Sequence, residues 1–152
     1  MDTPIFPPLP SDAFVRKAVM NGVVDGDTID VQIDVGWSLH MNERLRLESV
    51  NTPETRGDER EAGLFVKAWL EAELPTETPL VIASTVYDRT GRVRGKFGRT
   101  VAIVYRATDG WCLNEQLLTL KLAWPTDDSG SIIGERSMSL LTGVPEELRT
   151  PA

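Results

Sequence analysis

Apolar and polar residues alternate along several short segments of the chain, and a period of two is typical of β-strands that bury one face. The strictest alternation begins near Thr28 and has apolar residues at every second position: Ile29, Val31, Ile33 and Val35. Four other segments show a looser form of this pattern: residues 13–24, 39–50, 79–87 and 98–106. Asn21 and Gly22 interrupt the first of them and predict a turn or a bulge. The chain therefore predicts five strands.

Two segments follow the helical period instead. The first begins near Asp58, a potential N-cap, and ends at Pro75. Its predicted core face carries five apolar residues: Leu64, Phe65, Ala68, Trp69 and Ala72. The second begins near Asn114, the expected cap, and its apolar stripe carries Leu113, Leu117, Leu120 and Trp124. This order predicts a mainly β (α+β) fold, a five-stranded OB-like antiparallel barrel with two or three packed helices.

Composition limits the chain to one core. Its 152 residues, 41% of them hydrophobic, are enough for a single domain. We expect a flexible N-terminal segment (1–12), a barrel domain (13–125) and a partly ordered C-terminal tail (126–152). The single cysteine, Cys112, is expected to be a small buried residue and not a reactive thiol. Without a signal peptide or a long apolar run, we expect a cytoplasmic monomer without a membrane partner, compatible with a bacterial or phage protein.

The charge is unevenly distributed. The net charge is −7, but five of the 16 basic residues and no acidic residue lie in the segment 89–99, "RTGRVRGKFGR". Gly91, Gly95 and Gly98 would let the backbone approach a phosphate that the arginines bind. The alternative is a solvated hairpin tip whose charges protect a strand edge. A nucleotide-binding P-loop is excluded because the spacing of its glycines and its Lys-Ser/Thr pair are missing.

Four motifs in this chain occur in the order and approximate spacing of one known family: "VVDGDTIDV", "RLRLESVNTPE", "GKFGR" and "LNEQLLTLKLA". They resemble the staphylococcal (thermo)nuclease family, from Val23 to about Trp124. Each motif alone is short, and the assignment depends on all four in order. The resemblance implies an OB-fold endonuclease that uses Ca²⁺, with other divalent cations as alternatives. It would hydrolyse DNA and RNA with little sequence specificity.

The resemblance also implies a metal site. Asp27 matches an aspartate that ligates calcium, Asn51 stands at the position of a second metal aspartate, and Thr52 matches the residue that offers a backbone carbonyl. Asp25 would add negative potential nearby. Calcium prefers several oxygen ligands, so these residue types suit it. The alternative for Asp25-Gly26-Asp27, taken alone, is an ordinary turn.

Three further matches imply the catalytic groups. Glu54 matches the general base that activates the attacking water, and Pro53 would restrict the backbone before it. Arg46 and Arg99 match two arginines that clamp the scissile phosphate and stabilise the charge of the transition state. Outside the family pattern, Arg46 would be an ordinary exposed strand residue and Glu54 an ordinary acid at a helix start.

Substrate contacts are expected from the basic segment, where Lys96 matches a phosphate-binding lysine and Arg94 and Phe97 are placed beside it. The chain departs from the family at Asn51, which lacks the charge of aspartate and should weaken metal binding. Restoring aspartate at this position is expected to raise activity at low calcium. Phe97 stands in place of a tyrosine, and Lys121 occupies a usual glycine position.

Two functions therefore stay open. The first is the nuclease, acting on single-stranded DNA and RNA because a site recessed on a barrel reaches a splayed phosphate more easily than a stacked duplex. The second is a catalytically weak or inactive barrel that binds nucleic acid or a protein. Asn51 favours the second function, and the joint presence of Arg46, Glu54 and Arg99 favours the first.

Overall fold

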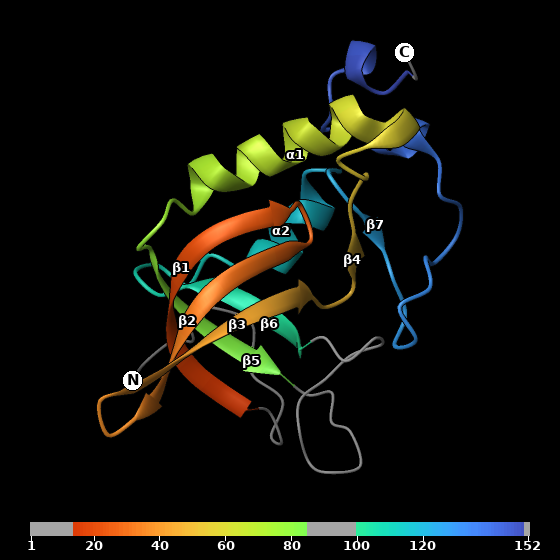
Figure 1. The fold of residues 1–152 in the computed structure, drawn as a ribbon. Helices are drawn as coiled ribbons and strands as arrows, with labels where there is room; N and C mark the ends of the chain where they lie inside the picture. The colour runs from red at the N-terminus through yellow and green to blue at the C-terminus, as the bar shows by residue number, and fades with distance from the viewer. Residues whose placement is uncertain (1–13, 85–99, 151–152) are drawn as a thin grey trace.

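Five strands close into a barrel in the order β1–β2–β3–β6–β5 (Figure 1). Their bounds are Phe14–Asp25 (β1), Thr28–Gly36 (β2), Leu39–Leu47 (β3), Pro79–Ser84 (β5) and Thr100–Arg106 (β6). The structure, a computed structural model, describes residues 14–84 and 100–150. The alternation of β2 is confirmed for Ile29, Val31 and Ile33, which are buried, whereas Val35 near the end of the strand is 36% exposed. A register shift between Met20 and Gly22 confirms the predicted bulge.

The barrel is mixed, which corrects the prediction that it is antiparallel. The pairs β1–β2, β2–β3, β1–β5 and β5–β6 are antiparallel, whereas β3 and β6 are parallel. The physical reason is the path of the chain. After β3 it crosses the barrel through a helix and returns along β5, so β6 runs in the direction of β3 and closes the barrel beside it (Figure 1).

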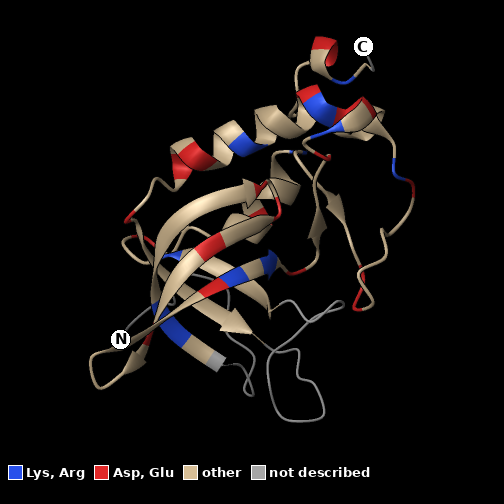
Figure 2. Cartoon of the chain, viewed as in Figure 1, with Lys and Arg blue, Asp and Glu red and all other residues tan. Residues whose placement is uncertain are grey.

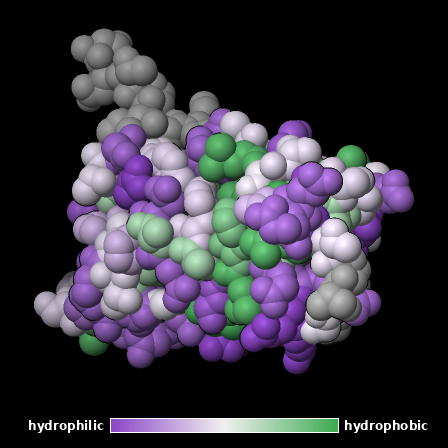
Figure 3. Space-filling view, turned by 90° about the horizontal axis from the view of Figure 1, so that it is seen from above, coloured by the Kyte–Doolittle hydropathy of each residue, from purple (hydrophilic) through white to green (hydrophobic). Residues whose placement is uncertain are grey.

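Helix α1 (Arg60–Glu73) covers one end of the barrel, but the predicted core face is wrong (Figure 1). Its buried residues are small or β-branched for the most part: Ala62, Gly63, Val66 and Leu70. Phe65 and Trp69 are only half-buried. On this side of the molecule, apolar side chains form a band between polar regions (Figure 3). The helix follows the 3-10 turn η1 (Gly57–Glu59), so Glu59 and not Asp58 occupies its N-cap position. Among the described residues, no helix is long and apolar enough to cross a membrane.

Helix α2 (Leu113–Thr119) buries Asn114 inside its first turn, so the expected cap has a different role. The Asn114 side chain accepts a hydrogen bond from the Val104 N–H at 2.9 Å and donates to the carbonyl of Glu48 at 2.9 Å. It therefore ties the helix to β6 and to the turn after β3. Cys112, directly before the helix, is buried as predicted, and burial raises the pKa of its thiol.

The end of α2 is a Schellman motif with Lys121 in the left-handed position. The N–H of Leu122 donates to the carbonyl of Leu117 at 2.9 Å, and the N–H of Lys121 donates to that of Leu118 at 3.2 Å. Lys121 has a φ of 56°, as expected for a residue at a usual glycine position. The predicted stripe is confirmed for Leu113, Leu117 and Trp124, which are buried, whereas Leu120 is 43% exposed.

A two-stranded sheet of β4 (Val50–Asn51) and β7 (Trp124–Pro125) lies beside the barrel. The chain then continues through two 3-10 turns, η3 (Met138–Leu140) and η4 (Glu146–Leu148). Leu141 and Val144 of this C-terminal segment are buried in the main core. The segment passes the N-terminal end of α1 (Figure 1), which brings it to the residues around Asn51.

The β2–β3 hairpin ends in an exposed tip. Trp37 and Ser38, its two central residues, have φ angles of 51° and 63°, which is the geometry of a type I′ turn. Trp37 is 93% exposed. Trp111, after β6, is half-buried and packs against Trp69 with ring centroids 5.9 Å apart.

Candidate active site

Asp27 connects three segments at the end of the barrel. It lies in the tight turn between β1 and β2, and its carbonyl accepts a hydrogen bond from the N–H of Leu47 at the end of β3. The Asp27 carboxylate accepts one hydrogen bond from the backbone N–H of Thr52 at 3.0 Å and another from the Thr28 hydroxyl at 3.1 Å. The side chain therefore fixes the segment after β4 to the β1–β2 turn.

Arg46, on β3, faces the same carboxylate. Its NH1 atom lies 3.4 Å from Asp27 Oδ2 and also donates to the backbone carbonyls of Asp27 and Leu47. The two side chains are 17% and 14% exposed, so water screens this pair only in part. The predicted metal ligand and the predicted phosphate-binding arginine are thus in direct contact.

The backbone of the β1–β2 turn lies close to the side chain of Thr52. The side chain of Thr52 packs against Gly26, where an added Cβ would lie 2.9 Å from Thr52 Oγ1. This hydroxyl is buried and has no hydrogen-bond partner in the described part of the chain. Asp25, predicted to add negative potential near the site, accepts a hydrogen bond from the Thr55 hydroxyl at 2.9 Å.

The backbone of Glu54 is held from two sides, while its side chain is exposed. Its N–H donates to Glu59 Oε1 at 2.9 Å. On the other side, helix α1 approaches so closely at Gly63 that an added Cβ would overlap the Glu54 carbonyl. A glycine is therefore required at this point of α1 for the segment 52–54 to sit against the helix.

Asn51 contacts Arg136 of the C-terminal segment, a residue that the sequence analysis does not identify. Arg136 NH1 donates to Asn51 Oδ1 at 2.9 Å, while its Nε and NH2 atoms bind the two carboxylate oxygens of Glu59 at 3.1 and 2.6 Å. The guanidinium carbon lies 4.4 Å from the ring centroid of Trp124. The sequence holds no signal for this cluster, because Arg136 is 85 residues from Asn51 in a segment without periodicity.

Charges of both signs meet where the N-terminal end of α1 adjoins the C-terminal segment (Figure 2). Burial raises the pKa of Glu59, but hydrogen bonds from Arg136 and from the Glu54 N–H, together with the charge of Arg136, outweigh burial. The pKa of Glu59 consequently lies below its ordinary value. Glu59 is therefore a carboxylate at neutral pH, and its negative charge forms an ion pair with Arg136.

The calcium ion implied by the resemblance does not fit the described residues as they are arranged. Calcium takes six to eight oxygen ligands. Asp27 offers a carboxylate, but both of its oxygens already accept hydrogen bonds and one faces Arg46. The Asn51 oxygen is bound to a guanidinium. Within residues 14–84 and 100–150, no three His, Cys, Asp or Glu side chains converge as a metal ion would need.

Four predicted residues belong to the basic segment and lie outside the described residues: Arg94, Lys96, Phe97 and Arg99. The predicted N-terminal segment, residues 1–12, also lies outside them. The structure therefore brings together Asp27, Arg46 and Thr52, while the side chain of Asn51, next to Thr52 in the chain, is bound by Arg136.

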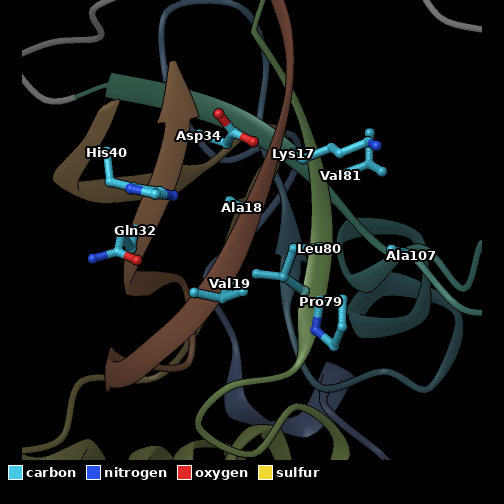
Figure 4. Close-up of a pocket in the computed structure, with 10 residues that line it drawn as sticks. All are labelled: Lys17, Ala18, Val19, Gln32, Asp34, His40, Pro79, Leu80, Val81 and Ala107. Atoms are coloured by element: carbon cyan, nitrogen blue, oxygen red, sulfur yellow. The ribbon is translucent and has the colours of Figure 1, made fainter. Parts of the chain in front are cut away.

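A pocket of about 420 Å³ lies elsewhere, on the outer side of β1, β2 and β5 (Figure 4). Lys17, Asp34 and His40 line this pocket from three different strands and do not converge on one point (Figure 4). Asp34 already accepts a hydrogen bond from the Gly36 N–H at 2.9 Å. The lining thus offers no converging set of catalytic groups.

Comparison with known proteins adds no family. No protein-family model matches the chain, and no curated protein matches it. The resemblance to the staphylococcal nuclease family therefore depends on the four sequence motifs.

Proposed function

We propose that this chain is a nuclease of the staphylococcal nuclease type, built on an OB-like barrel, that hydrolyses phosphodiester bonds in single-stranded DNA and RNA. The observation that supports this most is the contact between Arg46 and Asp27 at the end of the barrel, with Thr52 bound to the same carboxylate. Two sequence motifs supply these three residues, and the fold joins them. A purely local turn would not need an arginine from the third strand.

In this proposal each residue has one task. Arg46, whose guanidinium is oriented by Asp27 and by two backbone carbonyls, stabilises the negative charge that gathers on the phosphate. Arg99 provides the second guanidinium, as the resemblance implies. Glu54 takes the proton of the attacking water, and its anchored backbone limits where the carboxylate can lie. The phosphorus–oxygen bond to the leaving group breaks as the water oxygen bonds to phosphorus.

A second function is favoured by one observation, the bond between Asn51 and Arg136. It removes a ligand from the cation that the family would use. A barrel that keeps phosphate-binding arginines but lacks the cation would bind single-stranded nucleic acid without cutting it. The two functions differ in a single measurable property, which is turnover.

The test is cleavage of a fluorescent single-stranded DNA, with calcium titrated from zero, by the wild type and by Glu54→Gln. Glu71→Gln is the matched control, because Glu71 is an exposed acid on α1. We expect cleavage by the wild type and the control, and a loss of about a hundredfold or more in Glu54→Gln. Binding of the strand without cleavage at any calcium concentration would replace the nuclease by the binding barrel. Equal loss in both variants would remove Glu54 from the mechanism.

A further inference from the structure

The cluster around Arg136 resembles a binding site in which the bound group is the Arg136 guanidinium of the same chain. Asn51 and Trp124 are paired residues in the β4–β7 sheet, and the Arg136 guanidinium contacts both. The Trp124 indole N–H donates to the carbonyl of Ser137 at 3.0 Å, which fixes the backbone next to Arg136. Glu59 completes the cluster with a two-oxygen contact. One planar cation is thus held on three sides and stacked on a buried ring.

The charges of this cluster are balanced as they stand. Glu59 provides one negative charge against the positive charge of Arg136, and the Asn51 amide provides a neutral acceptor for the remaining contact. Two positive groups that share one oxygen would repel each other strongly at such short range. A divalent cation and Arg136 therefore cannot both use the side chain of residue 51.

We propose that Arg136 determines the cation affinity of the candidate site, because it holds the side-chain oxygen of Asn51 that a divalent cation would need. This inference rests on the proposed function, since the resemblance places a cation beside Asp27 and residue 51. The C-terminal segment and the cation then compete for residue 51. Arg136 is a determinant of metal affinity and not a catalytic residue.

The same cluster extends to Glu54. Glu59 Oε1 accepts both the Arg136 NH2 group and the Glu54 N–H. Loss of the guanidinium would leave Glu59 partly buried without its counter-charge and would loosen its hold on the Glu54 backbone. Arg136 therefore also acts as a positioning residue for the segment that carries Asn51 and Glu54.

The contact between Arg136 and Asn51 changes the effect that Asn51→Asp should have on calcium affinity. By sequence alone, Asn51→Asp restores a metal ligand and strengthens calcium binding. In the structure the new carboxylate would form an ion pair with Arg136 at the distance now spanned by a hydrogen bond, 2.9 Å. The substitution alone should therefore have little effect, and it should act only after Arg136 is removed.

The experiment is isothermal titration of Ca²⁺ into the full-length protein, as wild type, Asn51→Asp, Arg136→Gln and the double variant. We expect Asn51→Asp alone to bind Ca²⁺ within about threefold of the wild type. We expect the double variant to bind about tenfold more tightly than the two single changes would predict if they acted independently. Should Arg136→Gln fail to fold, Arg136→Lys replaces it, since lysine keeps the charge but cannot bridge Glu59 and Asn51 with one planar group.

The matched control is Arg149→Gln. Arg149 also ties down the C-terminal segment, through the carbonyls of Val144 and Ser139, but it has no bond to Asn51 among the contacts of the described residues. If Arg136 acts on residue 51 itself, Arg149→Gln leaves Ca²⁺ affinity unchanged. If loosening of the segment were sufficient, Arg149→Gln would raise Ca²⁺ affinity as much as Arg136→Gln, and the inference would be overturned.

Two other results would overturn the inference. One is that Asn51→Asp alone binds Ca²⁺ as tightly as the double variant, and the other is that no variant binds Ca²⁺ at all. DNA cleavage, measured separately, keeps this question apart from the proposed function. If the two substitutions affect Ca²⁺ affinity non-additively and the protein does not cleave DNA, the result supports the role of Arg136 and refutes the nuclease. Cleavage with independent effects of the two substitutions refutes the role of Arg136 and supports the nuclease.

Discussion

Replacing Asp27 by asparagine tests whether this residue is held by protein partners in the absence of a metal. A carboxylate kept for a metal ion is surrounded by surplus negative charge, so its neutralisation stabilises the metal-free protein. Asp27 instead accepts two hydrogen bonds and lies 3.4 Å from Arg46. Asp27→Asn should therefore destabilise the metal-free protein.

The magnitude follows from the contacts of this carboxylate. A hydrogen bond to a charged group contributes about 1.5–3 kcal/mol, and asparagine can accept with only one of its two terminal atoms. The Asp27 side chain is 14% exposed, so solvent replaces little of what is lost. We expect the free energy of unfolding to fall by about 2 kcal/mol.

The assay is urea unfolding in a chelating buffer, followed by the fluorescence of the four tryptophans. Asp30→Asn is the control. Asp30 forms an ion pair with Arg44 across β2 and β3, and the Asp30 and Arg44 side chains are 37% and 58% exposed, respectively. Its effect should be clearly smaller, since water screens an exposed ion pair. Equal or greater stability of Asp27→Asn in the metal-free protein would refute the view that Arg46 and Thr52 satisfy this carboxylate.

Three further predictions concern the supports of the site. Asn114→Ala should lower the free energy of unfolding by roughly 3 kcal/mol, because it removes the hydrogen bonds of this side chain to the buried N–H of Val104 and to the carbonyls of Glu48 and Ala102; urea unfolding measures the loss, and a loss below about 1 kcal/mol would contradict the role of this side chain. Lys121→Gly should stabilise the protein by about 1 kcal/mol by removing the strain of a left-handed lysine, seen as a higher thermal midpoint. The folded-state pKa of Glu59 is lowered, so its contribution is complete above the unfolded pKa of about 4.3 and is lost as the pH falls through the folded pKa. The difference in thermal midpoint between wild type and Glu59→Gln should thus shrink below about pH 4.5, and a constant difference would show that the charge of Glu59 does not stabilise the fold.

The strands could be predicted from sequence because their signal is local. Alternation in β2 needs only neighbouring residues, and the bulge at Gly22 follows from residue types alone. The direction of β6 relative to β3 depends on the whole path between them, so the antiparallel prediction had no local basis. The five strands could therefore be predicted, and which pair of them is parallel could not, although a closed ring of five strands must contain at least one parallel pair.

The core face of α1 shows why helix packing is harder to read. The pattern favours the largest apolar residues, Phe65 and Trp69, as the buried face. The structure buries Ala62 and Gly63 instead, because the Glu54 backbone passes so close that a side chain at Gly63 would overlap it. Tertiary approach, which no single-sequence pattern contains, selects small residues here.

The candidate site also has a part that the sequence predicts and a part that it does not. Asp27, Arg46 and Thr52 stand in local motifs, so the sequence could name them before the fold brought them into contact. Arg136 stands in no motif and reaches Asn51 only through the path of the C-terminal segment. A resemblance that ends near Trp124 could not include it.

The asparagine at position 51 has a physical explanation once Arg136 is considered. With Glu59 already neutralising Arg136, a carboxylate at position 51 would leave the cluster with one surplus negative charge in a half-buried place. The amide of Asn51 satisfies the same guanidinium without that charge. The contact with Arg136 therefore explains an asparagine at the position where the resemblance implies a metal-binding aspartate. The calcium titration of the Asn51 and Arg136 variants decides whether the side chain of residue 51 can bind a cation.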